Sequence, residues 1–173
     1  DFISAQDLLD EVNKDSIRFM MLNRSNDVEL DFDFDKVLEK SKENPVFYVQ
    51  YSFARISSLF RTINKDLNDK IDLDLKTLSL NENEIKILRK VFEWPKIIEK
   101  ASSKYEPHKI PYYLYELATL FHSYWSKGNE DQSFKFIAGG KIKKTETLAI
   151  ITLVAIVIQK GMSILGVSLP DKM

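Results

Sequence analysis

The sequence contains no cysteine and only two histidines, His108 and His122. The absence of cysteine excludes disulfide bonds, thiolate zinc sites, iron–sulfur clusters and cysteine nucleophiles, and it is typical of proteins from a reducing compartment. Two histidines are too few for a histidine-rich metal centre. With 173 residues the chain is long enough to bury the core of one domain without cross-links.

An excess of charge of one sign is also lacking, because 25 basic and 26 acidic side chains leave a net charge of -1. Proteins that bind nucleic acids usually carry a basic excess or a basic stripe, so composition gives no indication of such a partner. A local patch can still bind phosphate on an otherwise acidic surface. The charge balance therefore neither indicates nor excludes a nucleic-acid ligand.

Two segments that could hold a phosphate or a metal ion lack required residues. Gly139 to Lys141 is not a phosphate-binding loop, because Lys135 stands where the first glycine belongs and Ile142 where serine or threonine is needed. The alternating acids Asp31 to Asp35 lack the glycine and the glutamate of a calcium loop, since lysines occupy both positions. We predict no metal site and no catalytic residue, since no nucleophile is paired with a base.

One apolar run, Thr147 to Ile158, is a candidate membrane segment, but it stops after 12 residues. A transmembrane helix needs about 20 apolar residues, so we interpret the run as a helix buried in a bundle and expect no membrane contact. The N-terminus shows neither the basic nor the apolar region of a signal peptide. It also lacks an initiator methionine, so we expect the chain to be a fragment of a longer one.

Caps and apolar periodicity predict an all-α fold, a helical bundle with one short extended segment near the N-terminus. Asn44 followed by Pro45 is a strong helix start, and Gly166 is a stop. Ser79 to Glu82 has the spacing of a capping box. The predicted helices are 5–12, 16–24, 36–41, 45–65, a helix after the capping box through 85–92 that ends before Pro95, a helix from 95, 110–127 and 144–165, with an extended segment over 27–35. Between Gly128 and Gly140 we expect a mobile loop of about 15 residues.

The predicted helix 45–65 carries two faces that compete for the core. Tyr48, Tyr51 and Arg55 line one face, and Val49, Phe53, Ile56 and Phe60 form a neighbouring apolar stripe. Aromatic residues at helical spacing usually belong to the core. The alternative is that some of these rings are exposed and bind a ligand.

Four segments together resemble the C-terminal part of arginyl-tRNA synthetases, which are class I aminoacyl-tRNA synthetases. They are DLLDEVNKDSIRFMML, LDFDFDKVLEKSKENPVFYVQYSFARI, EPHKIPYYLYELATLFHSYW and, at the end of the chain, ILGVSLPDKM. The resemblance implies that residues 1–43 are the tail of the catalytic region and that residues 44–173 are the anticodon-binding helical bundle. The HIGH-like and KMSK-like motifs of ATP chemistry are absent from these residues. ATP and magnesium would then belong to the missing catalytic domain, and this fragment alone should be inactive.

The resemblance also implies which residues face the anticodon: Tyr48, Tyr51, Arg55, Trp125 and Met173. Trp125 stands where the family commonly has tyrosine, so a stacking surface is kept but a phenol is lost. The expected chemistry suits the role, because single-stranded bases stack on aromatic side chains and Arg binds phosphates or base edges with two parallel hydrogen bonds.

These observations lead to an RNA-binding module that recognises the anticodon loop of arginine tRNA, so that the full-length enzyme can attach arginine using ATP. We expect a cytoplasmic monomer that binds neither DNA nor membrane. The alternative is a helical scaffold that binds protein partners through its aromatic face. We interpret His122 as an ordinary helix side chain, and Asp15 and Arg18 as residues of a helix junction. We interpret Lys141, Lys143 and Lys144 as a solvated charge run, with contact to RNA phosphates as the alternative.

Overall fold

The computed structural model describes residues 12–25, 28, 34–74 and 76–173. Its elements are α2 (Lys14–Leu22), α3 (Phe34–Leu38), α4 (Pro45–Thr62), α5 (Glu82–Phe92), α6 (Trp94–Ser103), α7 (Lys109–Glu130), the 3-10 helix η1 (Gln132–Phe134), β1 (Ile137–Ala138), β2 (Lys141–Ile142) and α8 (Thr145–Leu165). The predicted all-α bundle is confirmed. The helix predicted over 5–12 and most of the extended segment predicted over 27–35 lie outside the described residues, and Phe34 already belongs to α3.

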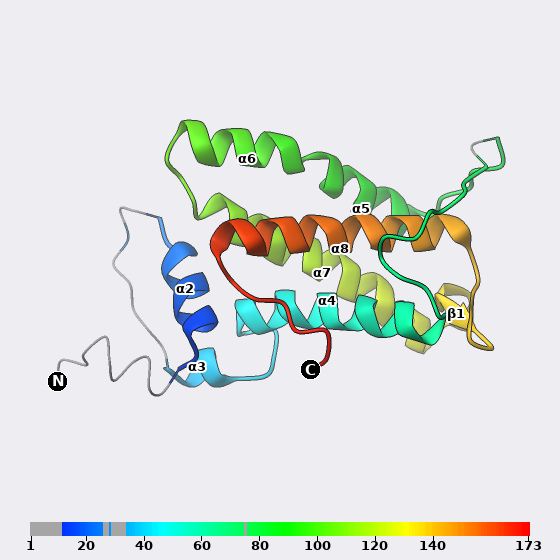
Figure 1. Ribbon diagram of the computed structural model, residues 1–173, viewed down its shortest axis with the longest axis horizontal. Coiled ribbons are helices and arrows are strands. Elements are labelled where there is room, and N and C mark those ends of the chain that lie inside the picture. The colour runs from blue at the N-terminus through cyan, green and yellow to red at the C-terminus, as the bar shows by residue number, and fades with distance from the viewer. Residues whose placement is uncertain (1–11, 26–27, 29–33, 75) are drawn as a thin grey trace.

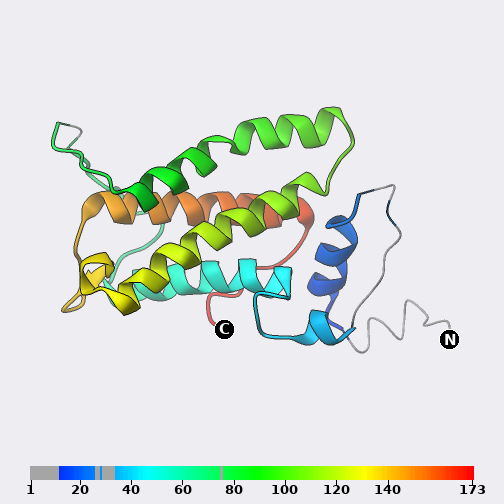
Figure 2. The same ribbon diagram turned by 180° about the vertical axis from the view of Figure 1, so that it is seen from behind.

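The helices form a bundle in which α8 packs against α4, α5 and α7 (Figure 1). Helix α6 continues from α5 and packs on α7, and α2 lies across the ends of α4 and α8 (Figure 2). Fully buried side chains from α4, α7 and α8 fill the centre, among them Ile56, Leu117, Phe121, Ile151 and Ile158. This core holds α4 and α7 side by side, which decides where their aromatic residues meet.

Helix α4 begins where its caps predict. The side chain of Asn44 accepts a hydrogen bond from the Phe47 amide at 3.2 Å, and Pro45 occupies the first turn, where no amide is needed. The same Asn44 side chain donates to the carbonyl oxygens of Val37 and Glu39, at 2.6 and 3.0 Å. One asparagine therefore starts the helix and fixes the chain that leads into it.

The capping box of α5 lies two residues after the predicted one. Asn81, and not Ser79, is the N-cap, and its side chain accepts from the Glu84 amide at 3.1 Å while Glu84 accepts from the Asn81 amide at 2.8 Å. Both pairs, Ser79 with Glu82 and Asn81 with Glu84, have the required spacing. Burial decides between them, because Glu84 is fully buried and Glu82 is exposed.

The segment after α7 is more ordered than the predicted mobile loop. Gly128 still belongs to α7, and η1 is followed by a hairpin in which Ile137 pairs with Ile142 and Ala138 with Lys141. Gly139 and Gly140 form its turn with φ angles of 56° and 74°, a left-handed conformation that glycine adopts without strain. The hairpin lies at one end of the bundle, beside the end of α7 (Figure 1).

Helix α8 is longer than the apolar run that predicts it, and by length and composition it could cross a membrane. In this structure 61% of its most apolar stretch is buried, and the helix packs mainly against α4, α5 and α7. Gly161 allows close packing, since a Cβ there would lie 2.7 Å from a methyl carbon of Leu114. The helix ends as predicted at Gly166, which is left-handed with φ 65°.

Residues 167–173 turn back from α8 and run along α4 (Figure 1). Gln50 donates to the Ser168 carbonyl at 2.9 Å and Arg61 donates to the Asp171 carbonyl at 3.1 Å. From α2, the Asp15 carboxylate accepts from Ser168, and Arg18 donates to the carbonyl of Leu165, the last residue of α8. Asp15 and Arg18 thus join α2 to the end of α8 and to the C-terminal tail, as a junction between helices far apart in sequence.

Candidate functional site

A groove of about 530 Å³ lies between α4, the end of α7 and the C-terminal tail. Four residues singled out from the sequence line it: Tyr51 and Arg55 from α4, Trp125 from α7 and Met173 from the tail. Arg61 and Lys172 add two further cationic side chains to its wall. The groove therefore combines aromatic rings with positive charge, a combination that suits flat, anionic ligands.

The groove continues into a second hollow towards α2 and α3. This hollow has a volume of about 620 Å³ and shares Tyr51 and Met173 with the first. At the boundary the rings of Phe47 and Tyr51 stack with centroids 5.6 Å apart and planes 18° from parallel. Tyr51 and Met173 therefore stand between two adjoining spaces, each large enough for a planar ring.

Arg55 lies in the middle of the first groove. Its guanidinium carbon is 4.3 Å from the centroid of the Tyr51 ring and 5.5 Å from that of Trp125, which are cation–π distances. Its Nη1 lies 3.2 Å from Nδ1 of His122. Arg55 has no carboxylate partner within the described part of the chain, so its charge is neutralised by no side chain there.

Other aromatic rings hold Trp125 in place. Its ring meets Phe136 of the hairpin nearly edge to face, at 5.5 Å and 85°, and Phe121 of its own helix at 5.7 Å. Phe121 and Phe136 are both buried. The ordered hairpin therefore has a direct consequence for the groove, because it fixes one of the groove's two largest rings.

Tyr48 does not line the groove, unlike the other four residues. Its ring lies against Tyr115 and His122, with centroids 5.3 and 4.4 Å away. Burial, followed by the neighbouring Tyr115, raises the pKa of the Tyr48 phenol, so the phenol stays neutral. Tyr48 packs on His122, which in turn lies against Tyr51, and any contact of Tyr48 with a ligand would have to be made outside this groove.

The sequence interpretation treats His122 as an ordinary helix side chain, and the structure places it, buried, behind the Tyr51 ring. Only 5% of it is exposed, and its ring lies 4.4 Å from Tyr48 and 5.6 Å from Tyr51. Its Nε2 lies 3.1 Å from the Tyr48 carbonyl oxygen. Burial, opposed by this hydrogen bond and assisted by the Arg55 charge, lowers the pKa of His122 to about 4. Its position three residues before Trp125, on the same helix face, was the available signal.

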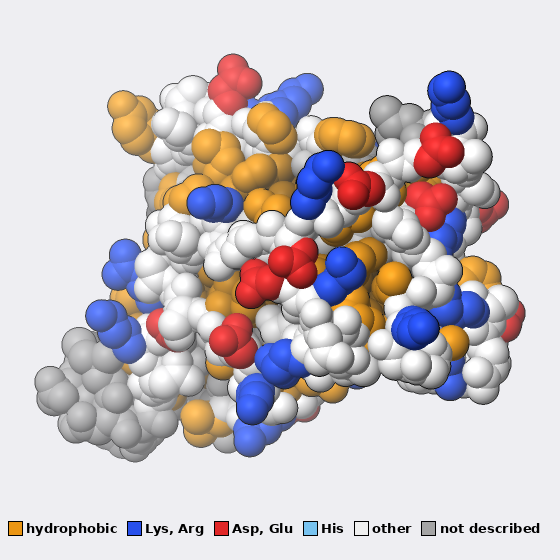
Figure 3. All heavy atoms as spheres, turned by 45° about the vertical axis from the view of Figure 1, so that its right-hand side comes forward, with side chains coloured by type: hydrophobic (Ala, Val, Ile, Leu, Met, Phe, Trp, Pro, Cys, Tyr) orange, Lys and Arg blue, Asp and Glu red, His pale blue; other side chains and the backbone are white. Residues whose placement is uncertain are grey.

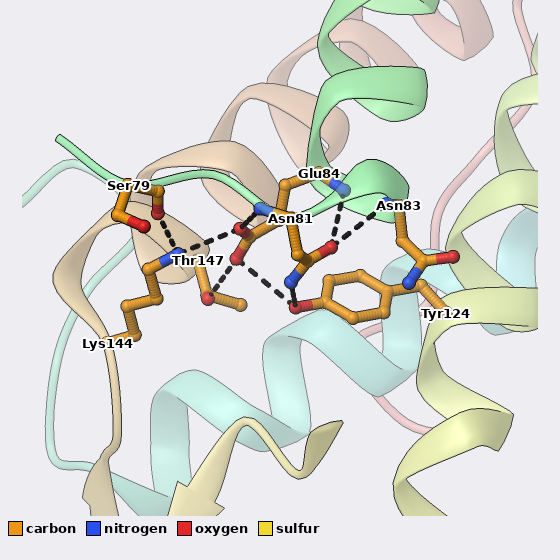
Figure 4. Close-up of polar contacts among 7 residues, drawn as sticks. All are labelled: Ser79, Asn81, Asn83, Glu84, Tyr124, Lys144 and Thr147. Carbon is orange, nitrogen blue, oxygen red and sulfur yellow. Dashed lines mark hydrogen bonds and ion pairs between the residues drawn. The ribbon is translucent and has the colours of Figure 1, made fainter. Parts of the chain in front are cut away.

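A second polar cluster lies around the fully buried Glu84, where α5, α7 and α8 meet (Figure 4). One carboxylate oxygen accepts from Thr147 at 2.5 Å and Tyr124 at 3.2 Å, and the other accepts from the Asn81 amide at 2.8 Å and Lys144 at 2.9 Å. Burial alone would raise the pKa of Glu84, but these hydrogen bonds together hold it below its ordinary value. The cluster is closed, because each carboxylate oxygen accepts two hydrogen bonds, and none of its residues lines the two hollows beside Tyr51.

The Glu84 cluster corrects the interpretation of one of the three lysines near the hairpin. Lys144 is half-buried, pairs with Glu84 and donates to the Ser79 carbonyl. Lys143 donates to the carbonyls of Gln132 and Ser133. Lys141 and Lys143 are exposed, as predicted for a solvated run, and only Lys144 departs from it. On the face shown in Figure 3, acidic and basic side chains are interspersed, with apolar side chains exposed between them.

The chain matches the family model of the DALR anticodon binding domain over residues 49–173. It is 53% identical over 173 residues to the arginine–tRNA ligase of Pelagibacter ubique, covering 100% of this chain and 30% of that protein. It is 45% identical to the arginine–tRNA ligase of Ruegeria pomeroyi, covering 99% of this chain and 30% of that protein. The chain thus spans about 30% of the length of the curated relatives it matches.

Solved structures resemble the chain over its full length. A Campylobacter jejuni protein assigned as an arginyl-tRNA synthetase superposes with a TM-score of 0.85 at 29% identity, covering 100% of this chain and 36% of that chain. The arginyl-tRNA synthetase of Thermus thermophilus superposes with a TM-score of 0.72 at 20% identity, covering 100% of this chain and 28% of that chain. At 20% identity the second likeness is one of fold alone.

Proposed function

Because this chain belongs to the DALR anticodon-binding domain family, we propose that its groove binds the anticodon loop of arginine tRNA. The chain is then the tRNA-binding part of an arginyl-tRNA synthetase, a longer protein that attaches arginine to its tRNA using ATP. The names of the relatives and the partial coverage of their length support this proposal.

One observation carries the assignment of the site. Tyr51, Trp125 and Met173 come from three separate parts of the chain, and the fold brings them around one arginine in a single groove. A core would bury these side chains, yet Met173 is 53% exposed and Tyr51, Arg55 and Trp125 are only half-buried. Rings held open to solvent by a rigid bundle are suited to stack unpaired bases.

Each side chain receives a role from its geometry. Tyr51 and Trp125 are the stacking surfaces, and Arg55 between them offers N–H donors to a base edge or a phosphate. Arg61 and Lys172 on the wall attract the phosphates that join successive nucleotides. Met173 separates the two hollows, so its removal would merge them and loosen the fit of a base in either one.

The remaining activity belongs to the part of the longer protein outside this chain. ATP and magnesium are assigned there, and in the described residues no group of three or more histidine or acidic side chains could hold a metal ion. The proposal further takes the protein to be a cytoplasmic monomer that binds tRNA and neither DNA nor membrane. Residues 1–43 are taken as the tail of the catalytic region and 44–173 as the tRNA-binding bundle.

The test is a fluorescence titration of the 173-residue chain with the anticodon stem-loop of arginine tRNA and, separately, with that of another tRNA. We expect tighter binding to the first. Trp125→Ala and Tyr51→Ala should each weaken that binding by about 5- to 150-fold, because a stacked base contributes about 1–3 kcal/mol. Tyr112→Ala is the matched control, since Tyr112 is 49% exposed on α7 and outside the groove.

Equal and weak binding of both stem-loops would contradict the proposal and favour the helical scaffold for protein partners. Unchanged affinity in both aromatic variants would instead move the RNA site away from this groove. In the longer enzyme, Trp125→Ala should raise KM for tRNA and leave KM for arginine and ATP unchanged, which separates tRNA binding from catalysis.

A further inference from the structure

The two ring nitrogens of His122 face partners of opposite character. The Tyr48 carbonyl oxygen, 3.1 Å from Nε2, can only accept a hydrogen bond, and the Arg55 guanidinium, 3.2 Å from Nδ1, can only donate one. Both contacts are satisfied together only when Nε2 carries the single proton and Nδ1 carries a lone pair. The partners therefore select one tautomer of a neutral imidazole.

We propose that His122 is a positioning residue for RNA binding, which fixes the Arg55 guanidinium in the groove through its unprotonated Nδ1. This rests on the proposed function, because the groove is taken to bind the anticodon loop. His122 lies behind the Tyr51 ring and is buried, so it acts on the RNA through Arg55 and makes no contact with the RNA itself.

The surroundings of Arg55 explain why such a residue is needed. Side-chain contacts of the guanidinium in the described structure are the faces of Tyr51 and Trp125 and the one hydrogen bond to His122. The ring contacts restrain the distance of the guanidinium from the two rings, but they leave it free to rotate within its own plane. The hydrogen bond to Nδ1 removes that freedom, and the other N–H donors are then pre-oriented for a ligand.

The protonation state agrees with this geometry. Burial lowers the pKa of His122 to about 4, so the ring is neutral at pH 7. The titratable groups that face it are Arg55, Tyr48 and Tyr51, all on α4, and no carboxylate of the described residues pairs with it. A cation at this position would repel Arg55 and lose the acceptor.

Two substitutions separate the two ring nitrogens. In His122→Asn the amide oxygen can take the place of Nδ1 and keep an acceptor for Arg55. In His122→Gln the amide nitrogen can take the place of Nε2 and keep the bond to the Tyr48 carbonyl, but Arg55 loses its acceptor. We expect His122→Gln to weaken binding of the arginine tRNA anticodon stem-loop about tenfold and His122→Asn less than about threefold. His108→Gln, outside the groove, is the control.

A double-mutant cycle tests the route of action. In an Arg55→Ala background neither His122 substitution should change RNA affinity further, because the group that His122 positions is gone. Equal tenfold losses with and without Arg55 would overturn the proposal. Thermal unfolding of each variant, followed at the same time, shows that affinity is compared between folded proteins.

Two NMR measurements test the proposal without RNA and so separate its failure from that of the proposed function. The ¹⁵N chemical shifts of the His122 ring should show an unprotonated Nδ1 and a protonated Nε2. The order parameter of the Arg55 Nε–H should be high in the unsubstituted chain and in His122→Asn, and lower in His122→Gln. The same Arg55 order parameter in all three would overturn the positioning role, and failure of the stem-loop to bind the unsubstituted chain would overturn only the proposed function.

Discussion

Two polar clusters lie in the same helical bundle, and they differ in how completely their groups are paired. Around Glu84, each carboxylate oxygen accepts two hydrogen bonds and the residue is fully buried. Around Arg55, the guanidinium has one side-chain hydrogen bond in the described structure and is half-exposed beside a groove. A closed cluster can only stabilise the fold, whereas an open one keeps donors for a ligand.

The two clusters are neighbours in the fold, so they can be compared within one local environment. Tyr124 and Trp125 are adjacent on α7, yet Tyr124 bonds to Glu84 while Trp125 lines the groove with Arg55. The hairpin residue Phe136 touches both rings, at 4.7 Å from Tyr124 and 5.5 Å from Trp125. The closed cluster thus lies directly behind the open one and anchors the segments that carry its rings.

The largest effect on stability is expected for Glu84→Ala. The substitution leaves Lys144, Thr147, Tyr124 and the Asn81 amide without their acceptor in a buried site, which should cost about 3–5 kcal/mol of unfolding free energy. Urea unfolding measures this cost. Glu82→Ala is the control, because Glu82 is exposed in the same helix turn and should change stability by less than about 0.5 kcal/mol. A similar small loss for Glu84→Ala would show that the cluster is not a structural anchor.

The next effect is a pH dependence that distinguishes the clusters. His122 has a folded pKa of about 4 against an ordinary 6.5, so between these values the unfolded chain binds the extra proton. Stability therefore falls as the pH drops from about 6.5 to 4, by about 2–3 kcal/mol. Glu84 has a lowered pKa, so its contribution is present above its ordinary value of about 4.5 and is lost as the pH falls further, through the folded pKa.

Urea unfolding at a series of pH values checks this. In His122→Asn the loss of stability between pH 6.5 and about 4.5 should disappear, while the loss at lower pH remains. If the variant kept the full decrease above pH 4.5, another group would be responsible and His122 would not be buried in its neutral form.

Much of the fold could be predicted because its signals are local. Asn44 with Pro45 starts α4, and Gly166 ends α8, since each acts through backbone groups within one turn of itself. The hairpin was also within reach, because two successive glycines favour a tight turn, but the sequence does not show that Phe136 beside it packs on Tyr124 and Trp125 of the preceding helix. The choice between two capping boxes depended on the burial of Glu84, which its local sequence does not reveal.

For the candidate site, too, some residues could be predicted from the sequence and others could not. Tyr51 and Arg55 are four residues apart, and helical spacing alone places them on one face. Trp125 and Met173 came from the resemblance to a family, and the structure brings both into the groove. Helical spacing places His122 on the face of Trp125, but its contact with Arg55, 67 residues away in sequence, forms only where α7 packs on α4 and cannot be read from the local pattern.

The smallest effect on stability is expected for Arg55→Ala. The substitution removes a half-exposed cation over Tyr51 and leaves the Nδ1 of His122 without its donor, which together should cost about 1 kcal/mol. The same substitution should weaken binding of the arginine tRNA stem-loop by about 5- to 150-fold, since a bidentate arginine contact contributes about 1–3 kcal/mol. Arg89→Ala, an exposed arginine on α5, should change neither quantity. Urea unfolding and stem-loop titration of the same samples compare the two. A stability loss as large as that of Glu84→Ala would mean that Arg55 belongs to the core and that both clusters are closed. A small stability loss together with weakened RNA binding would mean that the clusters differ as proposed: the donors of Glu84's partners are all used within the fold, whereas those of Arg55 are left for a ligand.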